Sequence, residues 1–337
     1  MKYRYDFNSG VQKLKSKTFI AISGFGLLLG STGISLAIIG TTNAVTPEVV
    51  YNALPSVSPA TNYPSQPFQA QQTFEFGDSI HLGGTARTLN TVTVGMSDWA
   101  LQSSPENVAF CNNNPGNCTA SGYTWPITLN VYSTHLNSSG APDQLLATTT
   151  QNISVPWRPA GPVCSTDSTA WTDGVNCYHG LAFNANFDLS GSNVVLPNDV
   201  IVSVAYNTES WGANPTGVDG PYDSLNVSIP DNQPVTVGSD ADTNGGFWNT
   251  HTCGWYHAAN AIAQCTLGNY GLYQDVGWTP NGTVALQITA TPVLPTTKDL
   301  CMNNGWKAYG STFKNQGDCV SFVATNGKNQ PSGPAKH

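Results

Sequence analysis

Charged side chains are scarce in this chain of 337 residues, and glutamate is especially rare. Only 9% of the residues are Asp, Glu, Lys or Arg, and the whole chain contains four glutamates. Asn, Thr, Ser, Gly and Pro take the place of the Lys and Glu that cover the surfaces of helices, and these residues favour strands and turns. The composition therefore argues against a mainly helical protein.

The sequence motifs of common hydrolases are also missing. There is no G-x-S-x-G nucleophile turn, no H-E-x-x-H helix and no close E-x-D-x-x-E set of carboxylates. Glycoside hydrolysis needs two carboxyl groups flanking the scissile bond, and two aspartates brought together by folding would still meet that need. We expect a non-catalytic protein that requires no cofactor, with a glycan-active hydrolase as an alternative.

Basic residues become rare after residue 44. The whole chain has 12 basic and 20 acidic residues, of which residues 1–44 hold five basic and one acidic. The remainder has 7 basic and 19 acidic residues, a net charge of −12. Because an acidic surface repels phosphates and anionic lipids, no nucleic-acid partner is expected.

The first 44 residues have the order of a secretory signal: positive charge, an apolar run from Thr18 to Gly40, and the small-x-small site Thr42-Asn43-Ala44. The positive charges are Lys2, Arg4, Lys13, Lys15 and Lys17. As a helix, the run would be about 33 Å long and could cross a bilayer, so an uncleaved membrane anchor is the alternative. Both interpretations predict an extracellular or cell-surface protein, with membrane contact only through this segment if it is uncleaved.

Eight cysteines follow the leader, and in an exported protein an even number predicts disulfides. Proximity in sequence favours four pairs, although eight cysteines allow 105 pairings. The pairs are Cys111 with Cys118, Cys164 with Cys177, Cys253 with Cys265, and Cys301 with Cys319.

Residues 73–291 show the strict alternation of apolar and polar residues that is typical of half-buried strands. Six segments carry it, and 74–82 and 145–155 are weaker candidates. The six are Val92–Met96, Ile127–Val131, Leu181–Leu189, Val200–Tyr206, Leu225–Ile229 and Val284–Ile288. So many strands in about 220 residues predict an all-β antiparallel sandwich or jelly roll with long, disulfide-tied loops.

Two segments of different composition flank this domain. Residues 45–72 contain five prolines and no sustained apolar period, so we expect a flexible linker. A second linker, 292–297, leads to residues 298–337, which have five lysines and two aspartates. That reversal of charge predicts a separate small basic module, held by Cys301–Cys319 and four aromatic residues, with an anionic envelope polymer as a candidate partner.

Several motifs resemble a group of uncharacterised exported bacterial β-sandwich proteins. They are Phe76-Gly-Asp-Ser-Ile-His-Leu-Gly-Gly-Thr-Ala-Arg-Thr-Leu-Asn90, Thr93-Val-Gly-Met-Ser-Asp-Trp99, Trp125-Pro-Ile-Thr-Leu-Asn-Val-Tyr132, Val155-Pro-Trp-Arg-Pro159 and Gly220-Pro-Tyr-Asp-Ser-Leu-Asn-Val227. Separately, Trp306 and Phe313-Lys-Asn-Gln-Gly-Asp-Cys319-Val resemble a short C-terminal segment of various exported bacterial proteins. The resemblance implies fold and export, and it supplies no activity.

Asp240, Asp242 and Asn244 fit the opening of a calcium loop, D-x-[DN]-x-[DN]-G. The twelfth position holds His251 rather than Glu, so an Asp/Asn/Gly turn between strands is the competing interpretation. Between these two interpretations, a structural calcium ion is the metal that this segment would hold. A zinc set of His251, Cys253, His257 and Cys265 has suitable residue types, but its spacing matches no standard zinc finger.

Tryptophans in polar, Gly-rich loops are the candidate binding residues, because exposed aromatic rings stack on the apolar faces of sugars. They are Trp157, Trp171, Trp211, Trp248, Trp255 and Trp278. The competing interpretation is that these rings cap the ends of the sandwich. We expect an adhesion or binding module for a glycan or surface protein; a structural envelope protein without a specific ligand is the alternative.

Overall fold

A computed structural model describes residues 46–138, 141–230, 234–241, 246–251, 254–256, 283–310 and 312–333. The predicted leader, residues 1–44, lies outside this range. Among the described residues, no helix combines the length and the apolar character that a membrane span requires.

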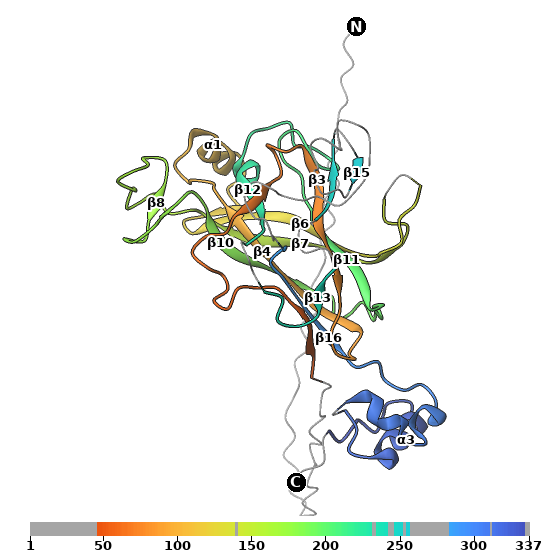
Figure 1. The fold of residues 1–337 in the computed structure, drawn as a ribbon. Coiled ribbons are helices and arrows are strands. Elements are labelled where there is room, and N and C mark those ends of the chain that lie inside the picture. Colours follow the sequence, from red (N-terminus) through yellow and green to blue (C-terminus); the bar gives the residue numbers. More distant parts are fainter. Residues whose placement is uncertain are drawn as a thin grey trace, which may run out of the picture. The chain divides into compact units, whose positions relative to one another are not determined.

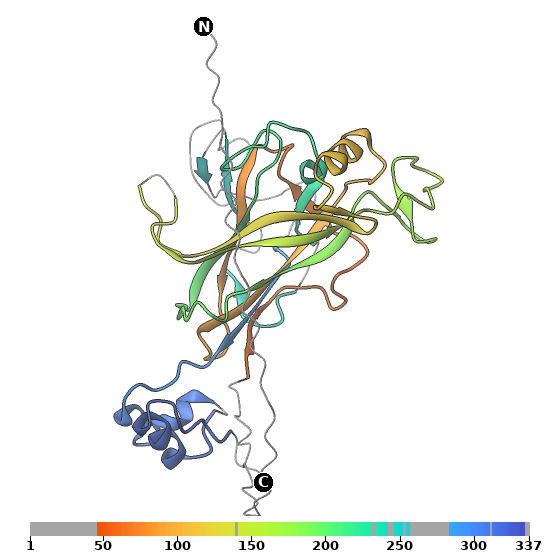
Figure 2. The ribbon, with the colours of Figure 1, turned by 180° about the vertical axis from the view of Figure 1, so that it is seen from behind.

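The main domain is a sandwich of two antiparallel sheets, which Figures 1 and 2 show from opposite sides. The first, sheet A, is built around β4 (Thr88–Asp98). One edge of β4 pairs with β10, and its other edge pairs with β16 and then with β12. Beyond these lie β1, next to β16, and β2, next to β12. The remaining strands of sheet A are β1 (Glu48–Asn52), β2 (Ser65–Pro67), β10 (Leu181–Asp188), β12 (Leu225–Ser228) and β16 (Leu286–Thr291).

Sheet B has the order β15-β14-β3-β11-β6-β5, with β7 also paired to β6 and β13 also paired to β3. Its strands are β3 (Thr73–His81), β5 (Cys118–Thr119), β6 (Gly122–Ser133), β7 (Leu145–Pro156), β11 (Asp199–Ala205), β13 (Ser239–Asp240), β14 (Phe247–Thr250) and β15 (Gly254–Tyr256). The inner faces of the two sheets enclose one apolar core.

The alternation in the sequence corresponds to this core. In β4, Val92, Val94 and Met96 are buried, and in β11, Val200, Val202 and Val204 are buried on the facing sheet. All six predicted segments, and both weaker ones, overlap observed strands. The predicted all-β sandwich is therefore confirmed.

The expected flexible linker at 45–72 is wrong, because this segment belongs to the sandwich. It supplies β1 and β2, and its Tyr51 and Phe68 are completely buried. The ring of Phe68 stacks on Tyr206 at a centroid distance of 3.9 Å. Pro67 fits at the end of β2 because β2 is the outermost strand on that side of sheet A, where a missing N–H costs no ladder bond.

Three of the four predicted disulfides are confirmed, with Cα–Cα distances of 5.5, 5.6 and 5.7 Å for Cys111–Cys118, Cys164–Cys177 and Cys301–Cys319. The fourth, Cys253–Cys265, lies outside the described residues. Cys111–Cys118 ties helix α1 (Pro105–Asn113) to β5. Cys164–Cys177 fastens the hairpin of β8 (Trp171–Thr172) and β9 (Cys177–Tyr178). Crosslinks therefore tie two of the long loops.

The C-terminal module contains η2 (Lys298–Cys301), η3 (Gly305–Tyr309) and α3 (Gln316–Ala324). Its small core surrounds the disulfide and the buried Phe313. Tyr309 and Phe322 pack against Phe313 with ring centroids 5.7 and 5.6 Å away. Asn315 caps α3 by accepting the N–H of Asp318 at 3.0 Å. One crosslink and a few aromatic rings hold the module, as predicted.

Candidate functional site

Three of the predicted binding tryptophans have buried rings. Trp157, Trp171 and Trp248 are 7, 8 and 3% exposed. Each indole N–H also has a partner: the carbonyl oxygens of Thr119 and Gly180 at 3.0 and 2.9 Å, and the Thr73 hydroxyl at 2.9 Å. In this conformation these rings present no open face to a sugar, and their packing agrees with the competing interpretation that they cap the fold.

Trp211 is the predicted binding residue with a half-buried environment. Its ring lies 4.5 Å, centroid to centroid, from the ring of His251, which also contacts Phe74 edge-on at 6.2 Å. Trp255 lies on β15, opposite Asn249 of β14. Trp278 is outside the described residues.

The predicted metal sets are described only in part. Asp240 lies on β13 opposite Ile80 of β3, and its carboxylate accepts a hydrogen bond from the Thr283 hydroxyl at 2.6 Å. Asp242 and Asn244 are outside the described residues. So are Cys253, His257 and Cys265 of the zinc set, whose remaining member, His251, is exposed.

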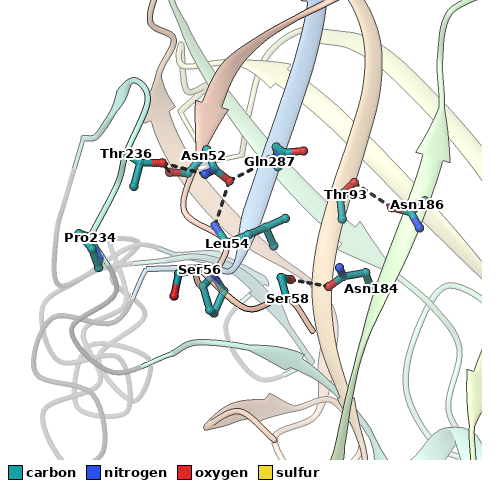
Figure 3. Close-up of a pocket in the computed structure, with 11 residues that line it drawn as sticks. Asn52, Leu54, Ser56, Ser58, Thr93, Asn184, Asn186, Pro234, Thr236 and Gln287 are labelled. Atoms are coloured by element: carbon teal, nitrogen blue, oxygen red, sulfur yellow. Dashed lines mark hydrogen bonds between the residues drawn. The ribbon is translucent and has the colours of Figure 1, made fainter. Parts of the chain in front are cut away.

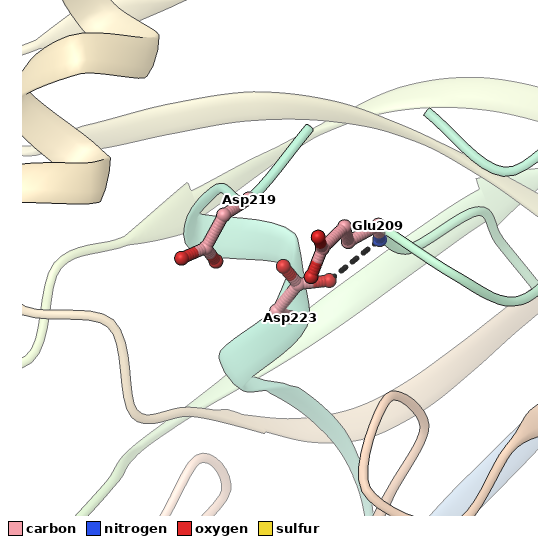
Figure 4. Close-up of side chains that lie close together, drawn as sticks. All are labelled: Glu209, Asp219 and Asp223. Atoms are coloured by element: carbon pink, nitrogen blue, oxygen red, sulfur yellow. Dashed lines mark hydrogen bonds between the residues drawn. The ribbon is translucent and has the colours of Figure 1, made fainter. Parts of the chain in front are cut away.

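An acidic cluster that sequence spacing did not suggest lies around the short helix η1 (Pro221–Ser224). Carboxylate oxygens of Glu209, Asp219 and Asp223 lie within 4.8 Å of one another (Figure 4). Asp223 accepts the backbone N–H groups of Glu209 at 2.7 Å and Gly220 at 3.2 Å. Burial raises the pKa of Asp223 to about 7, and the nearby Asp219 adds to the shift. These oxygens have the chemistry to hold a hard cation.

A polar groove of about 630 Å³ opens on the outer face of sheet A, the face directed away from the core (Figure 3). None of its described lining residues is charged. They are Asn52, Leu54, Pro55, Ser56, Ser58, Thr93, Asn184, Asn186, Pro234, Thr236 and Gln287. Amides and hydroxyls therefore supply its polar groups.

Strand register assembles the floor of this groove. Asn52 of β1 lies opposite Gln287 of β16, Gln287 lies opposite Thr93 of β4, and Thr93 lies opposite Asn186 of β10. These four side chains form one row across four strands. At the spacing of neighbouring strands, three gaps give the row a length of about 14 Å. Asn184 lies two residues from Asn186 on the same face, about 7 Å along β10.

Hydrogen bonds from sheet A and from the segment between β1 and β2 hold the amides in fixed orientations (Figure 3). Ser58 donates to the Asn184 carbonyl oxygen at 3.0 Å, and Thr93 donates to that of Asn186 at 2.8 Å. Gln287 donates its amide N–H to Asn52 at 3.1 Å. Within the described part of the chain, the Nδ2 groups of Asn184 and Asn186 have no acceptor. The groove thus offers two oriented donors and the Gln287 carbonyl as an acceptor.

Glu75 is a buried carboxyl group on the outer face of sheet B, and only 7% of it is exposed. Its Oε1 accepts hydrogen bonds from Ser203, from Asn130 at 2.8 Å and from Tyr132 at 3.0 Å. Thr148 in turn donates to Asn130 at 2.7 Å. Burial raises the pKa of Glu75, against the opposing effect of the three donors. Neither the alternation nor any motif marks this network in the sequence.

Comparison with known proteins gives no relative for this chain: no family model matches it, and neither do the curated proteins or the solved structures.

Proposed function

We propose that the chain is an exported, secreted or cell-surface β-sandwich that binds a neutral glycan in the groove on the outer face of sheet A. The observation that carries the proposal is the row of uncharged, pre-oriented amide and hydroxyl groups across four strands. Its length suits a short oligosaccharide rather than a single sugar.

The chemistry of the lining favours a polyhydroxylated ligand. A sugar hydroxyl donates and accepts, so it complements both the Nδ2 donors of Asn184 and Asn186 and the Gln287 acceptor. The described lining residues carry no charge, which favours a neutral ligand, and the acidic surface of the domain disfavours an anionic one. Leu54, with the ring carbons of the two lining prolines, supplies apolar contacts for sugar C–H groups. Because the amides are already held in place, binding loses less side-chain entropy.

Export is supported by the three disulfides, since such crosslinks persist in oxidising compartments outside the cytosol. The predicted leader at residues 1–44 gives the same location. A structural envelope protein with no specific ligand remains the second candidate, and it predicts a groove that binds nothing.

A glycan array probed with residues 45–337 is the first test, followed by titration calorimetry with the glycan that binds. The double variant N184A/N186A removes both oriented donors. Each lost hydrogen bond is worth about 0.5–1.5 kcal/mol, so affinity should fall at least about fivefold.

The matched control is N152A, an exposed asparagine on β7 of the other sheet, which should leave affinity unchanged. An array without any binding favours the structural alternative, and binding that survives N184A/N186A places the ligand elsewhere. A turnover assay on the bound glycan tests the hydrolase alternative.

A further inference from the structure

Two aspartates far apart in sequence, Asp78 and Asp240, project from the same face of sheet B. Asp240 of β13 lies directly opposite Ile80 of β3, so its side chain shares the face of Ile80, which is buried in the core. Asp78 is two residues from Ile80 on the same strand and therefore has the same orientation. Carboxylates in this diagonal relation across two strands are near enough to share one ligand.

Residues 283 and 284 also connect the two carboxylates. The Thr283 hydroxyl donates to Oδ2 of Asp240 at 2.6 Å, and the backbone N–H of Val284 donates to Oδ2 of Asp78 at 3.2 Å. Because these two donors belong to consecutive residues, both carboxylates lie next to the same short segment, Thr283–Val284. Asp78 is buried, whereas Asp240 is partly exposed, so one side of the pair is open to solvent.

A buried phenol packs against the turn that leads into β13. Tyr51 of β1 is 0% exposed, and its hydroxyl makes no hydrogen bond with the described residues. Burial raises the pKa of Tyr51, and the negative charges of Asp78 and Asp240 raise it further, so the hydroxyl lies within electrostatic reach of both. A buried hydroxyl that lacks a partner costs about 1–3 kcal/mol, which suggests that a further group belongs beside it.

The turn before β13 packs directly on the Tyr51 ring. A Cβ atom at Gly238 would lie 3.0 Å from Cδ2 of that ring and 2.5 Å from the carbonyl oxygen of His81. Gly238 also has φ of 77°, a conformation that favours glycine. The glycine therefore lets the turn that leads to Asp240 pack directly against the ring of Tyr51.

We propose that Asp78, Asp240 and Tyr51 form a binding site for a calcium ion, with Thr283 holding the Asp240 carboxylate. The side chains of Asp78, Asp240 and Tyr51 all offer oxygen atoms as ligands, and oxygen ligands suit a hard cation rather than zinc or copper. Two carboxylates match the charge of Ca²⁺, and water or backbone carbonyls complete its coordination.

Positive charge for this site is more readily supplied by an ion than by the protein. Between residues 45 and 297 the only lysine or arginine side chains are those of Arg87 and Arg158, and the range also holds five histidines. Arg87 donates to the carbonyl oxygen of Gly83 at 3.0 Å, and Arg158 donates to that of Trp99 at 3.0 Å. Both guanidinium groups thus donate to backbone carbonyl oxygens.

The test uses full-length protein stripped with EDTA and dialysed, and then titrated with CaCl₂ while its melting temperature is measured. At a calcium concentration 100-fold above Kd, the melting temperature should rise by roughly 5 °C or more. D240N should abolish this rise. Without calcium, D240N should melt at the same temperature as the wild type or higher, because the variant relieves repulsion between two carboxylates.

Three further variants test whether the calcium response comes from this site. Y51F, which keeps the ring, should weaken calcium binding in calorimetry. D188N, an exposed aspartate on β10, should keep the full response, as should E209Q in the acidic cluster around η1. A wild-type protein that does not respond to calcium overturns the proposal. So does a full response in D240N, or a response lost only in E209Q.

Discussion

Replacing Glu75 tests how the buried polar network of sheet B contributes to stability. In E75A, the donors from Ser203, Asn130 and Tyr132 lose their shared acceptor. An unsatisfied buried donor costs about 1–3 kcal/mol, but Tyr132 is partly exposed and can turn to water. We therefore expect E75A to lower the free energy of unfolding by about 2–4 kcal/mol.

E75Q should behave in the opposite way at neutral pH. Gln keeps an oxygen at Oε1 for the three donors and removes the burial of a negative charge. Because the pKa of Glu75 is raised in the folded state, that state binds more protons than the unfolded chain once pH exceeds the ordinary glutamate value. The stabilising contribution of the protonated group is complete at low pH and is lost as pH rises through the folded-state pKa.

Urea unfolding of wild type, E75Q and E75A between pH 4 and pH 8 measures both effects. Wild type and E75Q should be similarly stable near pH 4, and E75Q should become the more stable protein as pH rises. An E75Q protein that is less stable than wild type at pH 7.5 would show that the ionised carboxylate stabilises the network. A difference that does not change with pH would refute the raised pKa.

Two further measurements address the acidic cluster and the C-terminal module. The pKa of Asp223 is raised to about 7, so the stabilising contribution of its protonated carboxyl group should be lost as the pH rises from about 4 to about 7. D223N should remove that part of the pH dependence of the melting temperature. A pH profile that is the same in D223N and wild type would contradict the raised pKa. Deleting residues 298–337, which carry five lysines and two aspartates, should release the protein from an anionic envelope polymer, and retention on isolated cell envelopes that is unchanged by the deletion would exclude that partner.

Alternation predicted the core strands well because apolar residues at every second position are a local signal. β1 and β2 were missed because they are only five and three residues long and lie among prolines. Their burial comes from pairing with β16 and β12, which follow much later in the chain. A local pattern contains no information about such distant partners.

The groove could not be predicted for the same reason. Asn52, Thr93, Asn186 and Gln287 are ordinary polar residues in the sequence, and only strand register places them in one row. The tryptophans show the converse problem. A polar, Gly-rich neighbourhood suggested exposed rings, but Trp157 and Trp248 are buried by contacts with residues distant in sequence, and Trp171 packs within its own hairpin.

The pairing of β1 with β16 constrains the order in which the molecule can be made. Glu48 lies opposite Ala290, about 240 residues later, so the first strand has no partner on that edge until the last strand of the sandwich has been synthesised. Contacts this distant in sequence form slowly. A chain that must stay unfolded while it passes through a membrane channel would benefit from such a delay. Conversely, any fragment that ends before β16 leaves the edge of β1 exposed and able to pair with other chains.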